Sequence, residues 1–144
     1  MFLGEYQHTL DAKGRVSLPA KFRGVTGEKV VVTKGFEGCL YVFPAEGYTD
    51  FLGRLLEGND FSRKTRDVRR FFLAGAAEVN VDSAGRIPLT GPLRDYADLG
   101  KDVTVTGNGD RIEVWDSAKW AAYQIQIGGT VEDAAEELAD QGIL

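Results

Sequence analysis

Cysteine and histidine are nearly absent from this 144-residue sequence, and each scarcity excludes a class of protein. Cys39 is the only cysteine, so the chain can form no internal disulfide, as is typical of a reducing cytoplasm. It lies in the apolar run CLYVF, which predicts a buried strand thiol rather than a nucleophile. His8 is the only histidine and is expected on a strand surface. One histidine offers little toward a metal site, and we predict none.

Long apolar runs and enzyme motifs are also absent. No run of about 18 apolar residues occurs, so no membrane-spanning helix is expected. The segment MFLGEYQH lacks the basic and apolar parts of a secretory signal, which predicts a cytoplasmic protein. The sequence contains no phosphate-binding glycine loop, zinc cluster or nucleophile elbow. Acid–base chemistry would have to use Asp11, Asp82 or His8, and a carboxylate beside an arginine tends to stay ionised. We therefore predict no enzyme, cofactor or small-molecule substrate.

Basic residues are few and unevenly placed. The net charge of −5 is unusual for a protein that binds nucleic acid. Residues 1–94 carry 14 Lys and Arg against 11 Asp and Glu, whereas residues 95–144 carry 3 against 11. This uneven distribution of charge indicates that one surface of the protein binds an anion and that another surface provides solubility or binds partners.

The sequence contains two diverged copies of one pattern. DAKGRVSLP starts at Asp11 and DSAGRIPLT starts at Asp82, 71 positions later, and the same shift lays Arg23 on Arg94. KVVVTKG then matches DVTVTGN, and LYVFPAEGY matches IEVWDSAKW. We expect a first repeat over residues 3–53, a helical connector over 54–73, a second repeat over 74–127 and a helical tail over 128–144.

Each copy predicts the same order of elements. EYQHTL and AEVNVD alternate like strands, and RVSL and RIPL return after a tight turn. A short helical segment, a hairpin with a glycine-containing loop and a closing helix follow. About 50 residues bury too little apolar surface to be stable alone, so two such units should wrap their hairpins around one shared core. The predicted fold class is α/β, more closely a β-rich α+β fold with short helices.

The repeated turns carry the chemistry of interest. Asp11 and Asp82 can each accept backbone N–H bonds two or three residues on, and glycine allows the positive φ of a tight turn. Arg15 and Arg86 then begin a strand. A surface Asp–Arg bridge is worth only about 0–1 kcal/mol, which gives little reason to keep two. Arginine can also donate bidentately to guanine or phosphate. The spacing alone leaves both interpretations open.

The segments LGEYQHTLDAKGRVSLPAKFR and DSAGRIPLTGPLRDYADLGKDVTVTGNGDRIEVWD closely resemble the two halves of the MraZ family. The resemblance runs over nearly the whole chain and includes a D-x-x-x-R motif in each copy. It implies two fused AbrB/SpoVT-type swapped-hairpin domains, with a pseudo-two-fold axis, in a bacterial transcriptional regulator that assembles into homo-oligomeric rings. It also implies nucleoid association and binding to direct repeats in double-stranded DNA upstream of the division and cell-wall gene cluster, often including the regulator's own gene.

Carried over by position, the resemblance implies a set of site residues. These are the DNA-contacting Arg15, Arg86 and Lys13 and the loop-organising Asp11, Gly14, Asp82 and Gly85. Lys13 has Ala84 as its counterpart, so the two loops should be electrostatically unequal and the second should contact phosphate less. The acidic C-terminal half leaves one alternative open, an oligomeric or antitoxin-like module that binds protein without operator specificity.

The connector and the tail give weaker signals. Helical spacing predicts an apolar stripe of Phe61, Thr65, Val68 and Phe72. It predicts a second stripe of Arg63, Arg66 and Arg70, which is a solvated face unless it meets phosphate or a subunit. The tail has a modest apolar stripe and is expected to pack on the body or on a neighbouring subunit.

Overall fold

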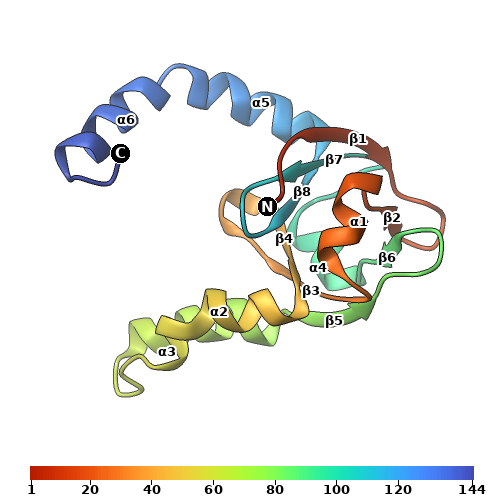
Figure 1. Cartoon of the computed structure of the whole chain (residues 1–144), viewed down its shortest axis with the longest axis horizontal. Coiled ribbons are helices and arrows are strands. Elements are labelled where there is room, and N and C mark those ends of the chain that lie inside the picture. The colour runs from red at the N-terminus through yellow and green to blue at the C-terminus, as the bar shows by residue number, and fades with distance from the viewer.

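Figure 1 shows the computed structural model of the chain, in which all residues from 1 to 144 are described. The first copy of the repeat contains β1 (Glu5–Thr9), β2 (Arg15–Ser17), α1 (Ala20–Thr26), β3 (Lys29–Lys34), the 3-10 turn η1 (Phe36–Gly38), β4 (Leu40–Pro44) and α2 (Ala45–Leu56). The second contains β5 (Ala77–Asn80), β6 (Arg86–Pro88), α4 (Gly91–Tyr96), β7 (Asp102–Gly107), β8 (Ile112–Asp116) and α5 (Ser117–Gly128). Between the copies lie α3 (Arg63–Arg69) and the π-helical turn η2 (Arg70–Ala74), and α6 (Val131–Asp140) ends the chain.

Strand exchange between the copies organises the fold. The six-stranded antiparallel sheet has the order β1-β7-β8-β4-β3-β5, and β2 pairs with β6 in a separate two-stranded ribbon. The first strand of each copy therefore pairs with the hairpin of the other copy, β1 with β7 and β5 with β3. The predicted β-rich fold of two intertwined repeats is confirmed.

The strand registers follow the internal symmetry of the sequence. Val16 faces Ile87 at the middle of the β2–β6 ribbon, and these residues are equivalent in the two copies. On either side of them Arg15 faces Pro88 and Ser17 faces Arg86. The ribbon therefore crosses a pseudo-two-fold axis, and its two arginines occupy equivalent places.

One apolar core is shared by both copies. Its buried side chains include Val16, Leu18 and Phe22 from the first copy and Ile87, Leu89 and Leu93 from the second. Burying an aliphatic side chain of this size contributes about 1.5–3 kcal/mol. Since each copy supplies only part of this core, separating the copies would expose its side chains to water. This agrees with the expectation that a unit of about 50 residues is too small to be stable alone.

Aromatic side chains form a second cluster on the other side of the sheet. Phe43, Tyr48 and Trp115 are all buried in it. Cys39 lies just before β4 and is buried there, and this burial raises the pKa of its thiol. The prediction of a buried thiol is confirmed, although Cys39 lies one residue before the strand.

The predicted apolar stripe of the connector is wrong at Phe61 and at Val68. Phe61 is 95% exposed, because α3 begins only after Ser62, whose hydroxyl accepts the N–H bond of Thr65 as an N-cap. Val68 is also exposed, and only Phe72 is buried. The π-helical turn adds a residue per turn after Arg69, so a spacing based on 3.6 residues loses register there.

Two helical arms leave the body of the molecule (Figure 1). One contains α2 and α3, and the other contains α5 and α6. Trp120 and Tyr123 of α5 pack against the aromatic cluster, whereas α6, in the predicted tail, has no buried residue. No helix is long and apolar enough to cross a membrane.

Candidate nucleic-acid interface

The ribbon of β2 and β6 presents the two repeated arginines on one face. Val16 and Ile87 point into the core and have no exposed surface. Because successive strand residues alternate between faces, Arg15 and Arg86 point to the opposite, outer face. Their side chains are 27% and 37% exposed. The structure therefore brings the two sequence-predicted arginines onto one outer surface.

Each arginine begins its strand after a turn that an aspartate holds. In the first turn Asp11 Oδ1 accepts bonds from the backbone N–H groups of Lys13 and Arg15, both at 2.9 Å. The other carboxylate oxygen, Oδ2, accepts from Arg15 Nε at 2.7 Å. One carboxylate thus fixes the backbone of the turn and the direction of the guanidinium that follows it.

The second turn repeats this arrangement. Asp82 Oδ1 accepts from the N–H groups of Ala84 at 3.0 Å and Arg86 at 2.8 Å, and Oδ2 accepts from Arg86 Nε at 2.8 Å. In both turns the N–H bond from the arginine is the largest cause that lowers the pKa of the aspartate. Both carboxylates are therefore ionised at neutral pH. In the ionised form they bind the guanidinium groups of Arg15 and Arg86 more strongly than in the protonated form.

Only one nitrogen of each guanidinium is used within the chain. The guanidinium groups of Arg15 and Arg86 form their hydrogen bonds and ion pairs through Nε alone. The two Nη groups of each form no hydrogen bond within the chain and remain available as a fork of donors. A planar fork with a fixed direction suits bidentate recognition of a base edge or a phosphate.

A second pair of arginines crosses between the copies, and the sequence prediction missed its role. Arg23 of α1 donates from Nε to the carbonyl of Leu18 at 3.0 Å. Arg94 of α4 donates from Nη1 to the carbonyl of Leu89. Each also lies against the turn of the other copy, Arg23 against Gly85 and Arg94 against Gly14. The equivalence of Arg23 and Arg94 in the repeat was the one signal available in the sequence.

The close approach of these arginines explains why each turn has glycine. Gly14 has φ 72° and Gly85 has φ 77°, a region that residues with a Cβ rarely adopt. A Cβ on Gly14 would lie 2.0 Å from Arg94 Nη1, and one on Gly85 would lie 2.0 Å from Arg23 Nε. Both turns therefore need glycine for their backbone conformation, and a Cβ at either position would also force the covering arginine to move.

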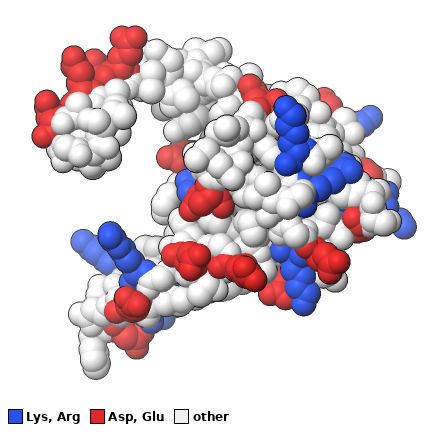
Figure 2. All heavy atoms as spheres, viewed as in Figure 1, with Lys and Arg blue, Asp and Glu red and all other residues white.

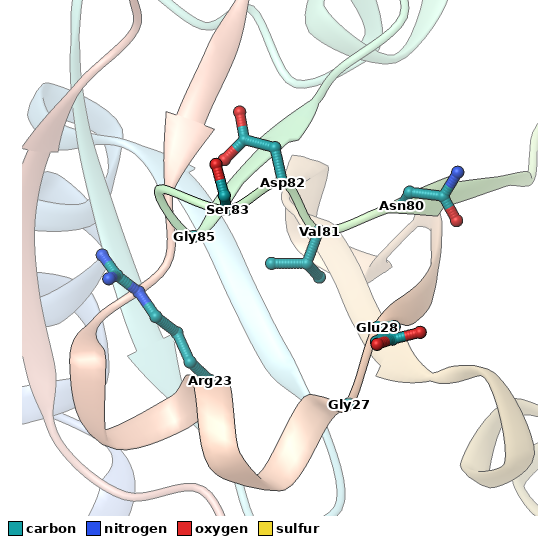
Figure 3. Close-up of a pocket in the computed structure, with 8 residues that line it drawn as sticks. All are labelled: Arg23, Gly27, Glu28, Asn80, Val81, Asp82, Ser83 and Gly85. Atoms are coloured by element: carbon teal, nitrogen blue, oxygen red, sulfur yellow. The ribbon is translucent and has the colours of Figure 1, made fainter.

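A shallow depression lies beside each turn, and the two differ in charge. Figure 3 shows the one beside the second turn, where Arg23 reaches from α1 toward Gly85. Its charged lining is Arg23, Glu28 and Asp82. The depression beside the first turn is lined by Lys13, Arg94, Lys101 and Asp11 among its charged residues. Lys101 and Lys13 take the places of Glu28 and Ala84, so the first depression is the more basic.

His8 lies near this region but takes no part in the turns. It is half-buried on β1, as a strand position predicts, and partial burial together with the charge of Arg23 lowers its pKa. No three His, Cys, Asp or Glu side chains come together in a group that could hold a metal ion.

The exchange of strands between two copies in one chain defines a tandem swapped-hairpin protein. A family model with the description "MraZ protein, putative antitoxin-like" matches the chain twice, over residues 1–71 and 72–141. The chain therefore belongs to the MraZ family, a family of transcriptional regulators and not of enzymes.

Relatives match the chain over nearly its whole length. The transcriptional regulator MraZ of Acetivibrio thermocellus is 46% identical over 143 residues, which are 99% of this chain and 100% of the relative. The proteins of the same name from Syntrophomonas wolfei and Natranaerobius thermophilus are 43% and 42% identical. They cover 99% and 97% of this chain, and 100% and 98% of their own lengths are matched.

Proposed function

We propose that this protein binds specific DNA sequences through the outer face of the β2–β6 ribbon. The observation that carries the proposal is the pair of guanidinium forks, Arg15 and Arg86, each held by an aspartate and with free Nη groups on one face. A two-stranded ribbon fits the major groove, where arginine pairs bidentately with guanine O6 and N7. Each such contact is worth about 1–3 kcal/mol of discrimination against a wrong base.

The first turn also anchors the protein to the DNA backbone. Lys13, Arg94 and Lys101 surround its depression, with Asp11 as the one acidic member. Lysine binds phosphate as a point charge and carries no sequence information. The first turn therefore combines base contact by Arg15 with phosphate contact, whereas the second turn depends mainly on Arg86.

The DNA-binding form is a ring of identical subunits on the nucleoid. A chain with a net charge of −5 binds a polyanion weakly when it offers only one ribbon. Several ribbons on one assembly pool their contacts, and linked sites raise avidity by roughly 10²–10⁴ when they engage together. The DNA consists of direct repeats upstream of the protein's own operon, in the division and cell-wall gene cluster, as the family resemblance implies.

Footprinting on the DNA upstream of the gene, followed by anisotropy titrations on the protected segment, tests this proposal. Arg15→Gln or Arg86→Gln should weaken binding to that segment by roughly 10–100-fold, and binding to scrambled DNA should change much less. Arg54→Gln is the control, because Arg54 is exposed on α2, away from the ribbon. Both ribbon variants binding the segment like wild type would refute the assignment.

The antitoxin-like description of the family supports one alternative function, that of a module that binds protein without operator specificity. Salt dependence separates the two. Binding through several phosphates falls steeply between about 50 and 200 mM salt. A protein that protects no DNA segment even at low salt would favour the protein-binding alternative.

A further inference from the structure

We infer that Ser17 and Pro88 are specificity-determining residues, which make the two ends of the ribbon contact different base pairs. The inference rests on the proposed function, since it concerns the residue beside each DNA-contacting arginine. It adds the chemistry of the ligand at each end. Ser17 takes a hydrogen-bonding group of a base edge, and Pro88 takes the C5-methyl group of a thymine.

The outer face of the ribbon consists of four side chains. β2 and β6 have three residues each, and the middle residue of each strand is buried in the core. Because side chains alternate between faces, the other four lie together on the outer face, namely Arg15, Ser17, Arg86 and Pro88. Ser17 is half-buried and Pro88 is exposed. Any difference between the two ends of this face must therefore come from these residues.

Each arginine has one of the other two residues directly opposite it. Arg15 faces Pro88, whereas Arg86 faces Ser17. Directly opposite residues are the closest side-chain neighbours on one face of an antiparallel pair, with Cβ atoms about 4.5–5.5 Å apart. A guanine bound by Arg15 therefore has the proline ring beside it, and a guanine bound by Arg86 has the serine hydroxyl beside it.

The hydrogen-bond ladder explains why the ribbon accepts proline at position 88. The backbone N–H of Leu89, one position beyond Pro88, donates to the carbonyl of Gly14 at 3.0 Å. Bonded and non-bonded pairs alternate along an antiparallel ladder, so the backbone nitrogen of residue 88 points away from β2 and needs no hydrogen. Substitutions of Pro88 by serine or alanine should therefore leave the ladder intact.

The two residues offer different groups to a base pair. The Ser17 hydroxyl forms no hydrogen bond within the chain and reaches the surface, so it is free to donate to a base edge or to accept from one. Pro88 has only an apolar ring. Among the bases, thymine alone presents a methyl group in the major groove. The Pro88 end should therefore favour thymine, and the Ser17 end a base that forms a hydrogen bond.

This difference gives each subunit a direction on the DNA. A half-turn about the pseudo-two-fold axis exchanges Arg15 with Arg86, so the arginines alone bind equally well in both orientations. The unequal basic groups beside the two turns do not decide the orientation, because phosphate contacts carry no sequence information. The half-turn also exchanges Ser17 with Pro88, and these are unlike. The preferred element should therefore be non-palindromic, as a direct repeat is.

The acidic tail of the chain lies away from the ribbon. Figure 2 shows the acidic side chains of α6 at the end of the molecule opposite to β2 and β6, which are labelled in Figure 1. The carboxylates of the two turns, Asp11 and Asp82, are each paired with an arginine. A base edge can therefore approach closely enough to contact Ser17 or Pro88 as well as the arginines.

Deoxyuridine tests the Pro88 end, because it removes only the methyl group of thymine. The probe is a duplex with a single repeat of the footprinted segment, in which each thymine is replaced in turn, and binding of the full-length protein is measured by anisotropy. Replacing one thymine of the repeat should weaken wild-type binding by about 3–5-fold, as expected for one buried methyl group. Pro88→Ser should bind that duplex and the thymine duplex alike, whereas Pro88→Ala should keep part of the difference. Deoxyuridine outside the repeat is the control.

Ser17→Ala tests the other end of the ribbon. It should weaken binding to the repeat by about 2–10-fold, as expected for one lost hydrogen bond, and should leave the deoxyuridine effect in place. It should also reduce discrimination at the base pair beside the guanine that Arg86→Gln no longer selects. Thr49→Ala removes an exposed hydroxyl from α2 and is the control. Unchanged affinity for scrambled DNA would show that the variants fold.

The arginine variants separate this inference from the proposed function. If Arg15→Gln and Arg86→Gln lose their preference for the operator, the proposed function holds. The inference is then overturned by a Pro88→Ser variant with the same deoxyuridine sensitivity as wild type, by a wild type with no sensitive thymine, or by a Ser17→Ala variant that binds like wild type. If both arginine variants keep their preference for the operator, the proposed function and the inference fail together.

Discussion

Arg94 lies across Gly14, so closely that a Cβ added to the glycine would stand 2.0 Å from Nη1 of the arginine. The two residues come from different copies of the repeat, and Arg23 and Gly85 repeat the relationship. The peptide carbonyls of both glycines also accept bonds across the ribbon, Gly14 from Leu89 N at 3.0 Å and Gly85 from Leu18 N at 2.8 Å. Each DNA-facing turn is thus fixed by the opposite copy.

Gly14→Ala should reduce the free energy of unfolding by about 1–3 kcal/mol, because it forces a Cβ into a left-handed turn against Arg94. Operator affinity should fall as well, since the displaced turn carries Arg15. Gly53→Ala is the control, as no atom lies within 4 Å of its Cβ position in α2, and it should leave stability equal or higher. Denaturant melts and operator titrations measure both effects. A Gly14→Ala variant as stable as wild type would show that the turn adapts.

Asp82→Ala should weaken operator binding without removing any group that contacts DNA. The variant loses the acceptor for the N–H groups of Ala84 and Arg86 and for Arg86 Nε. Asp82→Asn keeps an acceptor oxygen and should have a smaller effect. Both losses should stay below the about 1–3 kcal/mol of a base contact, because Arg86 is still present. Asp50→Ala, at an exposed position of α2, serves as the control in the same anisotropy assay. Wild-type affinity in both Asp82 variants would mean that the carboxylate does not organise the turn.

The unequal charges beside the two turns predict opposite effects from a matched pair of substitutions. Glu28→Lys gives the second depression the basic group that the first has at Lys101, and Lys101→Glu does the reverse. Glu28→Lys should raise the affinity for any duplex and steepen the salt dependence of binding by about one counterion. Lys101→Glu should lower the affinity and flatten the salt dependence by a similar amount. Preference for operator over scrambled DNA should change little, because phosphate contacts carry no sequence information. Salt titrations on both DNAs measure the slopes. Identical slopes in wild type and both variants would place these residues away from the phosphates.

Local patterns in the sequence were sufficient to predict the order of the elements and the two turns. Period-two alternation and the repeated Asp-x-x-Gly-Arg segment depend on neighbours a few residues apart, and such signals survive in any fold. The covering of Gly14 by Arg94 and the capping of α2 by Arg69 join residues far apart in sequence, so no local pattern could reveal them. The exposure of Phe61 was missed because α3 begins only after the N-cap Ser62, which leaves Phe61 outside the helix.

The spacing between operator repeats offers the last prediction, which joins the ribbon to the ring. Equivalent ribbons on one assembly can engage one duplex only where the same groove turns toward the protein, about every 10–10.5 bp. Inserting about 5 bp between two repeats moves the second to the far side of the duplex, so affinity should fall toward that of a single repeat. Inserting about 10 bp restores the side but lengthens the reach, so recovery should be partial. Anisotropy on three operators that differ only in the spacer measures this, with a single-repeat duplex as the reference. Equal affinity for the native spacing and the half-turn insertion would mean that the subunits do not engage the repeats together.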